Sequence, residues 1–134
     1  MPTVRDMIRR KGSEVFSILP DASVYEALVF MAKHNTGALM VVSGNKVEGI
    51  LSERDCVRRM ELEGRTAKNA QVSEIMTEKV VFVEAGQELE ECMALMIEKN
   101  IRHLPVMDGK DLLGLISVRD VLKEVVDVQK LMIS

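Results

Sequence analysis

Two seven-residue segments of the chain carry the residue types best suited to binding chemistry. Residues 49–55 read Gly-Ile-Leu-Ser-Glu-Arg-Asp, and residues 114–120 read Gly-Leu-Ile-Ser-Val-Arg-Asp. In each segment an apolar run ends at a serine, and an aspartate follows three residues later, where a helix is predicted to begin. The same spacing makes an ordinary helix cap, with the hydroxyl on a backbone N–H and the carboxylate near the positive end of the helix dipole. Capping alone is therefore one interpretation of both segments.

Three features of these segments indicate a nucleotide site in addition to a cap. Gly49 and Gly114 remove the side chain where strand meets turn, so that another group can approach the backbone closely. An arginine precedes each aspartate, beside a helix N-terminus that already suits phosphate. A carboxylate accepts hydrogen bonds from a ribose diol, as it does in dinucleotide sites. The candidate residues are Ser52, Arg54 and Asp55 in the first segment and Ser117, Arg119 and Asp120 in the second.

Other catalytic and metal-binding patterns are weaker. The glycine spacings at 44–49 and 109–114 match the start of a P-loop, but apolar residues follow where Lys and Ser or Thr are needed. Cys56 and Cys92 form no CxxC pair, and we interpret them as small core residues. The two histidines complete no cluster with metal-ligand spacing. The sequence therefore predicts neither a metal site nor catalytic residues.

The candidate segments belong to an internal repeat with an offset of 65 residues. When residues 23–56 are aligned with residues 88–121, ten of the 34 positions are identical, and about half of the others exchange one apolar residue for another. Both glycines, both serines, both arginines and both aspartates of the candidate segments are among the identical positions. Self-similarity of this kind indicates a tandem duplication.

The opening segments of the two halves also correspond, but at a different offset. Residues 4–7 match residues 72–75 at an offset of 68, so the first half carries about three extra residues, which we place within Arg9–Ser13. A half of about 65 residues has little core of its own, and we expect the two halves to be stable mainly when packed together. We place the two repeats at residues 1–66 and 67–134.

Each repeat is predicted to form a strand, a helix, two strands and a helix. The runs Val15–Ile18 and Val80–Val83 are β-branched or aromatic and end at turn-forming residues. Apolar residues at helical spacing follow. The first of these helices is opened by a capping box at Ser23–Glu26, and the two helices end at Asn35 and Asn100, since asparagine tolerates the left-handed conformation. The remaining strands are Leu39–Val42 and Val47–Leu51, then Leu104–Met107 and Leu112–Ile116, joined by hairpins whose Gly and Asn residues supply positive φ, with closing helices from near Asp55 and Asp120.

The composition limits the class of protein. The 134 residues are 47% hydrophobic and 29% charged, which is typical of an ordered globular chain. No apolar run approaches the ~20 residues of a membrane helix, and the opening residues lack the apolar stretch of a secretory signal. A net charge of −3, with one Tyr, three Phe and no Trp, disfavours a broad nucleic-acid surface. We therefore expect a cytoplasmic protein with neither a nucleic-acid nor a membrane partner.

Taken together, these patterns resemble a tandem cystathionine-β-synthase-type (CBS) domain pair, often called a Bateman module. Residues 72–77, Val-Ser-Glu-Ile-Met-Thr, and residues 102–106, Arg-His-Leu-Pro-Val, add to the resemblance, which covers essentially the whole chain. The sequence is similar to the short stand-alone bacterial or archaeal members. The resemblance implies an α/β (α+β) fold of two pseudo-symmetric β-α-β-β-α repeats packed through their sheets. It also implies a homodimer built by apolar helix faces.

The resemblance further implies a regulatory module that binds adenosine compounds in the cleft between its repeats. AMP, ADP or ATP are the expected ligands, with NAD or S-adenosylmethionine as further candidates, and no cofactor is obligatory. By position, Asp55 and Asp120 would hold ribose hydroxyls, and the serines and arginines beside them would lie near the ribose and phosphates. Arg102 and His103 would contact phosphate, although His103 as a simple rim residue is an equal interpretation.

The first copy departs from the family pattern at the phosphate contacts. Gly37 and Ala38 stand where the second copy has Arg102 and His103, and Met40 replaces the usual proline. Unequal affinities at the two sites are therefore expected. The apolar walls for adenine implied by the resemblance are Phe16, Thr36, Val81 and Ile101.

Three functions remain open from the sequence. The first is a ligand sensor that binds an adenosine nucleotide and transmits this to an unidentified regulated protein. The alternative is a partner-binding CBS scaffold without a nucleotide ligand. The third is a small nucleotide-processing enzyme, which would need metal-holding carboxylates and a base around the phosphates. Because the candidate aspartates lie in a neighbourhood suited to ribose, we do not expect an enzyme.

Overall fold

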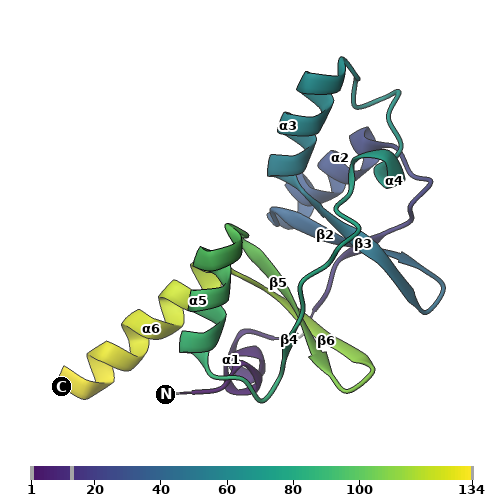
Figure 1. The fold of residues 1–134 in the computed structure, drawn as a ribbon. Coiled ribbons are helices and arrows are strands. Elements are labelled where there is room, and N and C mark those ends of the chain that lie inside the picture. Colours follow the sequence, from purple (N-terminus) through teal and green to yellow (C-terminus); the bar gives the residue numbers. More distant parts are fainter. Residues whose placement is uncertain (1, 13, 134) are drawn as a thin grey trace. The chain divides into compact units, whose positions relative to one another are not determined.

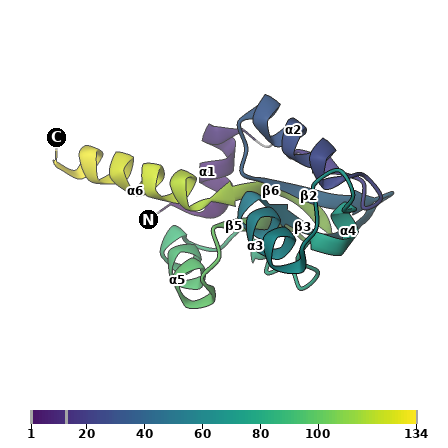
Figure 2. The ribbon, with the colours of Figure 1, turned by 90° about the horizontal axis from the view of Figure 1, so that it is seen from above.

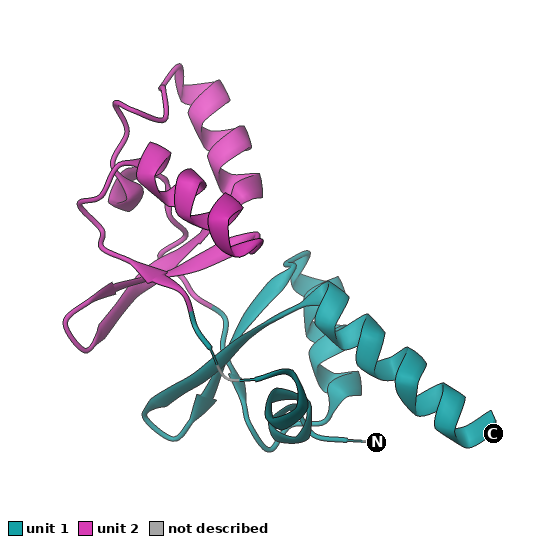
Figure 3. Cartoon of the chain, turned by 180° about the vertical axis from the view of Figure 1, so that it is seen from behind, with its two compact units in different colours: residues 1–15, 81–134 teal, residues 16–80 magenta. Residues whose placement is uncertain are grey.

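The computed structural model describes residues 2–12 and 14–133. Within them the chain forms two three-stranded sheets and six helices (Figure 1). This is the mixed architecture of helices and strands expected from the sequence. The chain divides into two compact units, one formed by residues 16–80 and the other by residues 1–15 together with 81–134 (Figure 3). We call them the middle unit and the terminal unit.

The middle unit holds the sheet β1-β2-β3, in which β1 is parallel and β3 antiparallel to β2. A hairpin joins β2 to β3, and Gly44 takes φ 62° at its turn. The prediction that Asn45 also takes a positive φ in this turn is wrong, because Gly44 alone has that conformation here. The elements are β1 (Ser17–Ile18), α2 (Val24–His34), β2 (Ala38–Ser43), β3 (Lys46–Ser52), α3 (Glu53–Glu63) and α4 (Val72–Ile75).

The terminal unit repeats this plan with the sheet β4-β5-β6, again with one parallel and one antiparallel pair. Its long closing helix extends beyond the rest of the unit toward the C-terminus (Figures 1 and 2), and its last apolar side chains are 78–86% exposed. The elements are α1 (Val4–Lys11), β4 (Val83–Glu84), α5 (Leu89–Lys99), β5 (His103–Asp108), β6 (Asp111–Ser117) and α6 (Val118–Ile133).

The predicted C-terminal ends of α2 and α5 are confirmed, together with the serine half of the capping box predicted at Ser23–Glu26. The Ser23 hydroxyl accepts a hydrogen bond from the Glu26 N–H at 3.0 Å, so this part of the predicted cap is present. Asn35 and Asn100 take left-handed conformations with φ of 50° and 52°. The first strand of each repeat is shorter than predicted. Only two residues of it pair with the central strand before the chain turns away.

Each compact unit contains the opening helix of the other sequence repeat. The core of the middle unit includes Val72 and Ile75 from α4, which belongs to the second repeat in sequence. The core of the terminal unit includes Val4, Met7 and Ile8 from α1, which belongs to the first. The sequence repeats at 1–66 and 67–134 and the compact units are therefore two different divisions of the chain.

The two glycines that open the candidate segments are packed against these exchanged segments. The sequence suggested that a ligand would approach there, but the structure places protein against both glycines. A Cβ on Gly49 would lie 2.6 Å from the carbonyl oxygen of Thr77, and a Cβ on Gly114 would lie 2.5 Å from Cδ1 of Ile8. Ile50 and Thr77 also exchange both backbone hydrogen bonds, at 3.0 and 2.8 Å. The glycines are thus required for packing inside each unit.

Replacing these glycines by alanine should destabilise the chain unequally. Gly49→Ala should cost roughly 1–3 kcal/mol, because its Cβ meets a backbone carbonyl that two hydrogen bonds hold in place. Gly114→Ala should cost less, since it meets the end of a flexible side chain. Urea unfolding of both variants, with Gly86→Ala as a control that meets nothing within 4 Å, measures the difference. A larger loss for Gly114→Ala would contradict this packing argument.

Candidate functional site

In the terminal unit, the second candidate segment forms the turn from β6 into α6. The Ser117 hydroxyl accepts a hydrogen bond from the Asp120 N–H at 3.1 Å, and the Ser117 N–H donates to Asp120 Oδ2 at 2.9 Å. The capping interpretation of the serine is therefore confirmed here. The Asp120 side chain remains about 25% exposed. It can thus act as both a helix-start carboxylate and an acceptor for a bound group.

A lysine of the first repeat reaches this carboxylate. The ammonium group of Lys11, in the last turn of α1, lies 2.8 Å from Asp120 Oδ2 and donates to the carbonyl oxygen of Leu115 at 2.7 Å. Lys11 comes from the region where the sequence placed about three extra residues, and α1 has eight residues where α4 has four. The insertion therefore lengthens α1 as far as the candidate site; Ser13, at its predicted end, lies outside the described residues.

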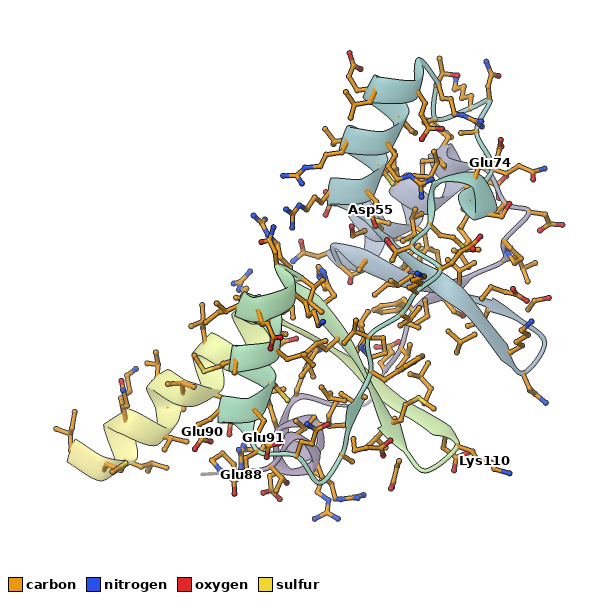
Figure 4. All side chains as sticks on the ribbon, viewed as in Figure 1. Asp55, Glu74, Glu88, Glu90, Glu91 and Lys110 are labelled. Atoms are coloured by element: carbon orange, nitrogen blue, oxygen red, sulfur yellow. The ribbon has the colours of Figure 1, made fainter. Side chains whose placement is uncertain are left out.

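In the middle unit, the turn from β3 into α3 has the same local geometry. The Ser52 hydroxyl accepts from the Asp55 N–H at 3.1 Å, so this serine is also a cap. Asp55 lies at the start of α3 (Figure 4) and is half-buried. Its Oδ2 accepts a hydrogen bond from the Thr77 hydroxyl at 3.0 Å. The partner of Asp55 is therefore a neutral side chain that follows α4.

The residues predicted to contact phosphate lie beside these turns. Ala38 pairs with Ser52, and His103 pairs with Ser117 in the same register. The carbonyl oxygens of Gly37 and Arg102 accept from the first N–H groups of α3 and α6, at 3.0 and 2.9 Å. Ala38 itself is fully buried, whereas Arg102 is exposed. Each unit thus brings its serine, its aspartate and the two residues that precede or begin its central strand to one end of its sheet.

The remaining candidate residues include the two arginines and Thr36. Arg54 and Arg119 lie in the first turns of α3 and α6. The Thr36 hydroxyl donates to the carbonyl oxygen of Ala38 at 3.1 Å. Seven of the fourteen predicted residues fall in each unit: Phe16, Thr36, Gly37, Ala38, Ser52, Arg54 and Asp55 in the middle unit, and Val81, Ile101, Arg102, His103, Ser117, Arg119 and Asp120 in the terminal unit.

The predicted adenine walls are partly engaged by the protein itself. The Phe16 ring stacks on His34, with centroids 4.3 Å apart, and meets Phe30 edge-on at 5.8 Å. Val81 and Ile101 pack against the core of the terminal unit while remaining half-buried. Their contact with a base stays a prediction.

Sequence reasoning missed the two residues that touch the aspartates. Lys11 ends the opening helix α1 and Thr77 follows the opening helix α4, and each helix packs in the unit built mainly by the other repeat. The change of the repeat offset from 65 to 68 indicated extra residues in the first repeat, but it did not predict that they bring Lys11 to Asp120. A contact between residues more than 100 positions apart has no local sequence signal.

Two of the candidate residues of the terminal site, Asp120 and His103, have shifted pKa values. Burial alone would raise the pKa of Asp120, but hydrogen bonds from Lys11 and from the Ser117 N–H outweigh it and hold the pKa below its ordinary value. Desolvation lowers the pKa of His103, opposed by the charge of Asp120 and assisted by the charges of Lys11 and Arg102. At neutral pH the site therefore presents a carboxylate at Asp120 and a neutral imidazole at His103.

The cysteines contribute no such chemistry. Cys56 and Cys92 are 2% and 0% exposed, which confirms that they are core residues. Burial raises the pKa of each thiol to about 11. In the part of the chain that the structure describes, no group of three or more His, Cys, Asp or Glu residues is placed to hold a metal ion. A search of residues 2–12 and 14–133 also finds no helix long and apolar enough to span a bilayer.

Comparison with known proteins identifies the family. The CBS domain family model matches the chain twice, at residues 4–62 and 72–127. The chain therefore belongs to the CBS domain family and carries a pair of these domains. CBS domain-containing protein CBSX3, mitochondrial, of Arabidopsis thaliana is 35% identical over 92% of this chain and 65% of that protein. CBS domain-containing protein YhcV of Bacillus subtilis is 32% identical over 90% of this chain and 83% of that protein.

Solved structures show the same fold. A putative signal-transduction protein with CBS domains from Burkholderia ambifaria is 43% identical, with a TM-score of 0.91, over 94% of this chain and 95% of that one. The CBS domain pair of protein MJ0100, solved with 5′-methylthioadenosine and S-adenosyl-L-methionine, has a TM-score of 0.81 at 21% identity, over 93% and 96% of the chains. Among the sequence relatives, an inosine-5′-monophosphate dehydrogenase of Methanocaldococcus jannaschii is 34% identical over 82% of this chain but only 21% of its own length.

The lowered pKa of His103 predicts a pH effect on stability. Between the folded pKa and the unfolded value of about 6.5, the unfolded chain binds more protons. The stabilisation from neutral His103 is therefore complete above pH 6.5 or so and is lost as pH falls through the folded pKa. Urea unfolding at pH 7.5 and 5.0 should show a larger loss of stability for wild type than for His103→Gln, which removes this imidazole and keeps the rest of the chain. An equal loss in both would show that His103 is not desolvated.

Proposed function

We propose that this chain is a regulatory ligand-sensing module that binds an adenosine nucleotide at one site in each compact unit. The observation that carries the proposal is the duplicated carboxylate at the start of a helix, Asp55 and Asp120, each beside a strand end and an arginine. AMP, ADP or ATP are the ligands this arrangement suits best, with NAD and S-adenosylmethionine as further candidates.

The proposed contacts follow from the chemistry of the site. Ribose hydroxyls would donate to the carboxylate oxygens, and the phosphates would lie near the helix N-terminus with its arginine. In the terminal unit, Arg102 and His103 would add phosphate contacts that Gly37 and Ala38 do not provide in the middle unit. The bound adenosine compounds of the MJ0100 domain pair indicate that this fold accepts such ligands.

The same geometry suggests how a ligand would be sensed. Each aspartate already accepts a hydrogen bond from a residue at the end of an opening helix or just after it, Lys11 or Thr77. A ribose at the carboxylate would compete with that bond and change how firmly the opening helix is held. Because each opening helix belongs to the other repeat in sequence, binding in one unit would act on the segments that connect the units. A regulated partner protein would respond to this change in how the opening helix is held.

One observation favours the alternative, a partner-binding CBS scaffold without a nucleotide ligand. Both carboxylates have protein donors at 2.8–3.0 Å, so neither needs a ligand to be satisfied. The two functions make different predictions for nucleotide binding, and the aspartates separate them.

Isothermal titration of the chain with AMP, ATP, NAD and S-adenosylmethionine tests the proposal. Wild type should bind two molecules per chain, whereas Asp55→Ala and Asp120→Ala should each bind one, with affinity at the altered site lowered by roughly 10-fold or more. Asp108→Ala is the matched control, because Asp108 also pairs with a cation of α1, Arg5, at 2.8 Å. It should bind as wild type does. No binding by any compound at millimolar concentration would reject the sensor and leave the scaffold.

We also propose that the module forms homodimers through the exposed apolar face of α6. Leu122, Val126 and Ile133 lie on one side of this helix, within about 40° of each other at 100° per residue, and are 50%, 46% and 86% exposed. Exposed apolar side chains on one helix face, here with Gln129 between Val126 and Ile133, suit a subunit interface. Soluble cytoplasmic location and the absence of nucleic-acid or membrane partners remain predictions.

Light scattering coupled to size exclusion tests the interface. Wild type should have twice the 15.0 kDa mass of one chain, and the variant Leu122→Glu/Val126→Glu should have the mass of one. Val57→Glu on α3 places the same charge on a side chain that is 70% exposed in the middle unit, and it should remain dimeric. A monomeric wild type, or a dimeric double variant, would rule out this face.

A further inference from the structure

The two candidate sites contain the same pair of acceptors at the strand-to-helix turn. In the middle unit the acceptors are the Ile50 carbonyl oxygen and Asp55 Oδ2. Thr77 satisfies both, since its backbone N–H donates to the carbonyl at 2.8 Å and its hydroxyl donates to the carboxylate at 3.0 Å. One neutral residue, Thr77, therefore satisfies both acceptors of this turn.

In the terminal unit a cation takes the place of that neutral residue. The equivalent acceptors, at an offset of 65 residues, are the Leu115 carbonyl oxygen and Asp120 Oδ2. The single ammonium group of Lys11 donates to both, at 2.7 and 2.8 Å. Lys11 reaches them because α1 is longer than α4 by one turn. The duplication has thus kept the acceptors and changed the charge of the donor.

Other charged residues increase this difference between the sites. Each unit has one arginine before its aspartate, Arg54 or Arg119, so these arginines do not distinguish the two sites. Arg102 and His103 accompany the terminal site alone, and the charges of Lys11, Arg102 and Asp120 all act on His103. The terminal site therefore has Lys11 on its carboxylate and Arg102 near its imidazole, where the middle site has Thr77 and Gly37 at the corresponding places.

We propose that Lys11 is a specificity-determining residue that makes the Asp120 site select adenosine compounds carrying a phosphate, whereas Thr77 leaves the Asp55 site without that requirement. This inference rests on the proposed nucleotide-binding function and extends it to the charge of the ligand at each site. It assigns a role to the inserted turn of α1.

The physical reason is the fate of the ammonium group when ribose binds. Ribose hydroxyls that donate to Asp120 displace Lys11 from its anion, and a partly buried cation without an anion is unfavourable. A phosphate on the same ligand supplies a new anion, and the flexible lysine side chain can turn to it. Adenosine offers no such replacement, so it must compete with the ion pair. At Asp55 the displaced group is a neutral hydroxyl, and no charge is left uncovered.

Single-site chains test this role. In the Asp55→Ala background only the Asp120 site remains, and titration with AMP and with adenosine gives its preference for phosphate. Lys11→Gln removes the charge but keeps an N–H donor, and it should lower the AMP-to-adenosine preference by about 10-fold or more. Lys11→Arg should retain the preference. Lys110→Gln removes a positive charge at the β5–β6 hairpin, at the other end of β6 from Ser117 (Figure 4), and should also retain it.

Each outcome decides a different claim. An unchanged preference in Lys11→Gln, or an equal fall in Lys110→Gln, would overturn the specificity role while leaving nucleotide binding intact. A chain in the Asp120→Ala background, which keeps only the Asp55 site, should show a smaller preference for AMP than the Asp55→Ala chain; an equal or larger one also overturns the inference. If wild type binds neither compound, the nucleotide sensor itself is rejected, and the role of Lys11 is rejected with it.

Discussion

The structure depends on the contact between each opening segment and a strand-to-helix turn. In the middle unit, Ile50 and Thr77 exchange two backbone hydrogen bonds above Gly49, where no side chain could fit. In the terminal unit, Ile8 packs on Gly114 and Lys11 bonds to the carbonyl of Leu115. These contacts complete the two hydrophobic cores, because buried residues of both opening helices belong to them. They also supply the partners of both candidate aspartates, so the fold and the site share the same atoms.

The duplication has changed the chemistry of this contact without changing its place. Arg59 of α3 donates to the carbonyl oxygens of Ile75 and Met76 at 2.7 and 2.8 Å, and so caps the end of α4. The equivalent position on α6 is Glu124, which is 9% exposed and pairs with Arg10 of α1. A cation on carbonyls in one unit thus corresponds to an ion pair in the other. Breaking either contact would leave a partly buried charge or unpaired carbonyls, which is unfavourable in both units.

A shared contact gives a physical basis for regulation. A ligand that only filled a cavity could bind without affecting the rest of the chain. In the proposed sensor, a ligand at the carboxylate of Asp55 or Asp120 would compete with a hydrogen bond that holds an opening helix. Its binding energy is therefore linked to the position of that helix. Because the donors at the two carboxylates differ, the two proposed links would be unequal, as the proposal for Lys11 requires.

The sequence by itself determined the parts of this protein that depend on neighbours in the chain. The repeat, the hairpins, the left-handed ends at Asn35 and Asn100 and the serine caps follow from residue types at short spacing. The family followed from the same motifs, and the positions of Asp55 and Asp120 with them. Only the tertiary structure decided what covers the two glycines and what touches the two aspartates. These contacts join an opening helix to the unit of the other repeat, across as many as 109 positions between Lys11 and Asp120, and no periodic pattern reports such a distance.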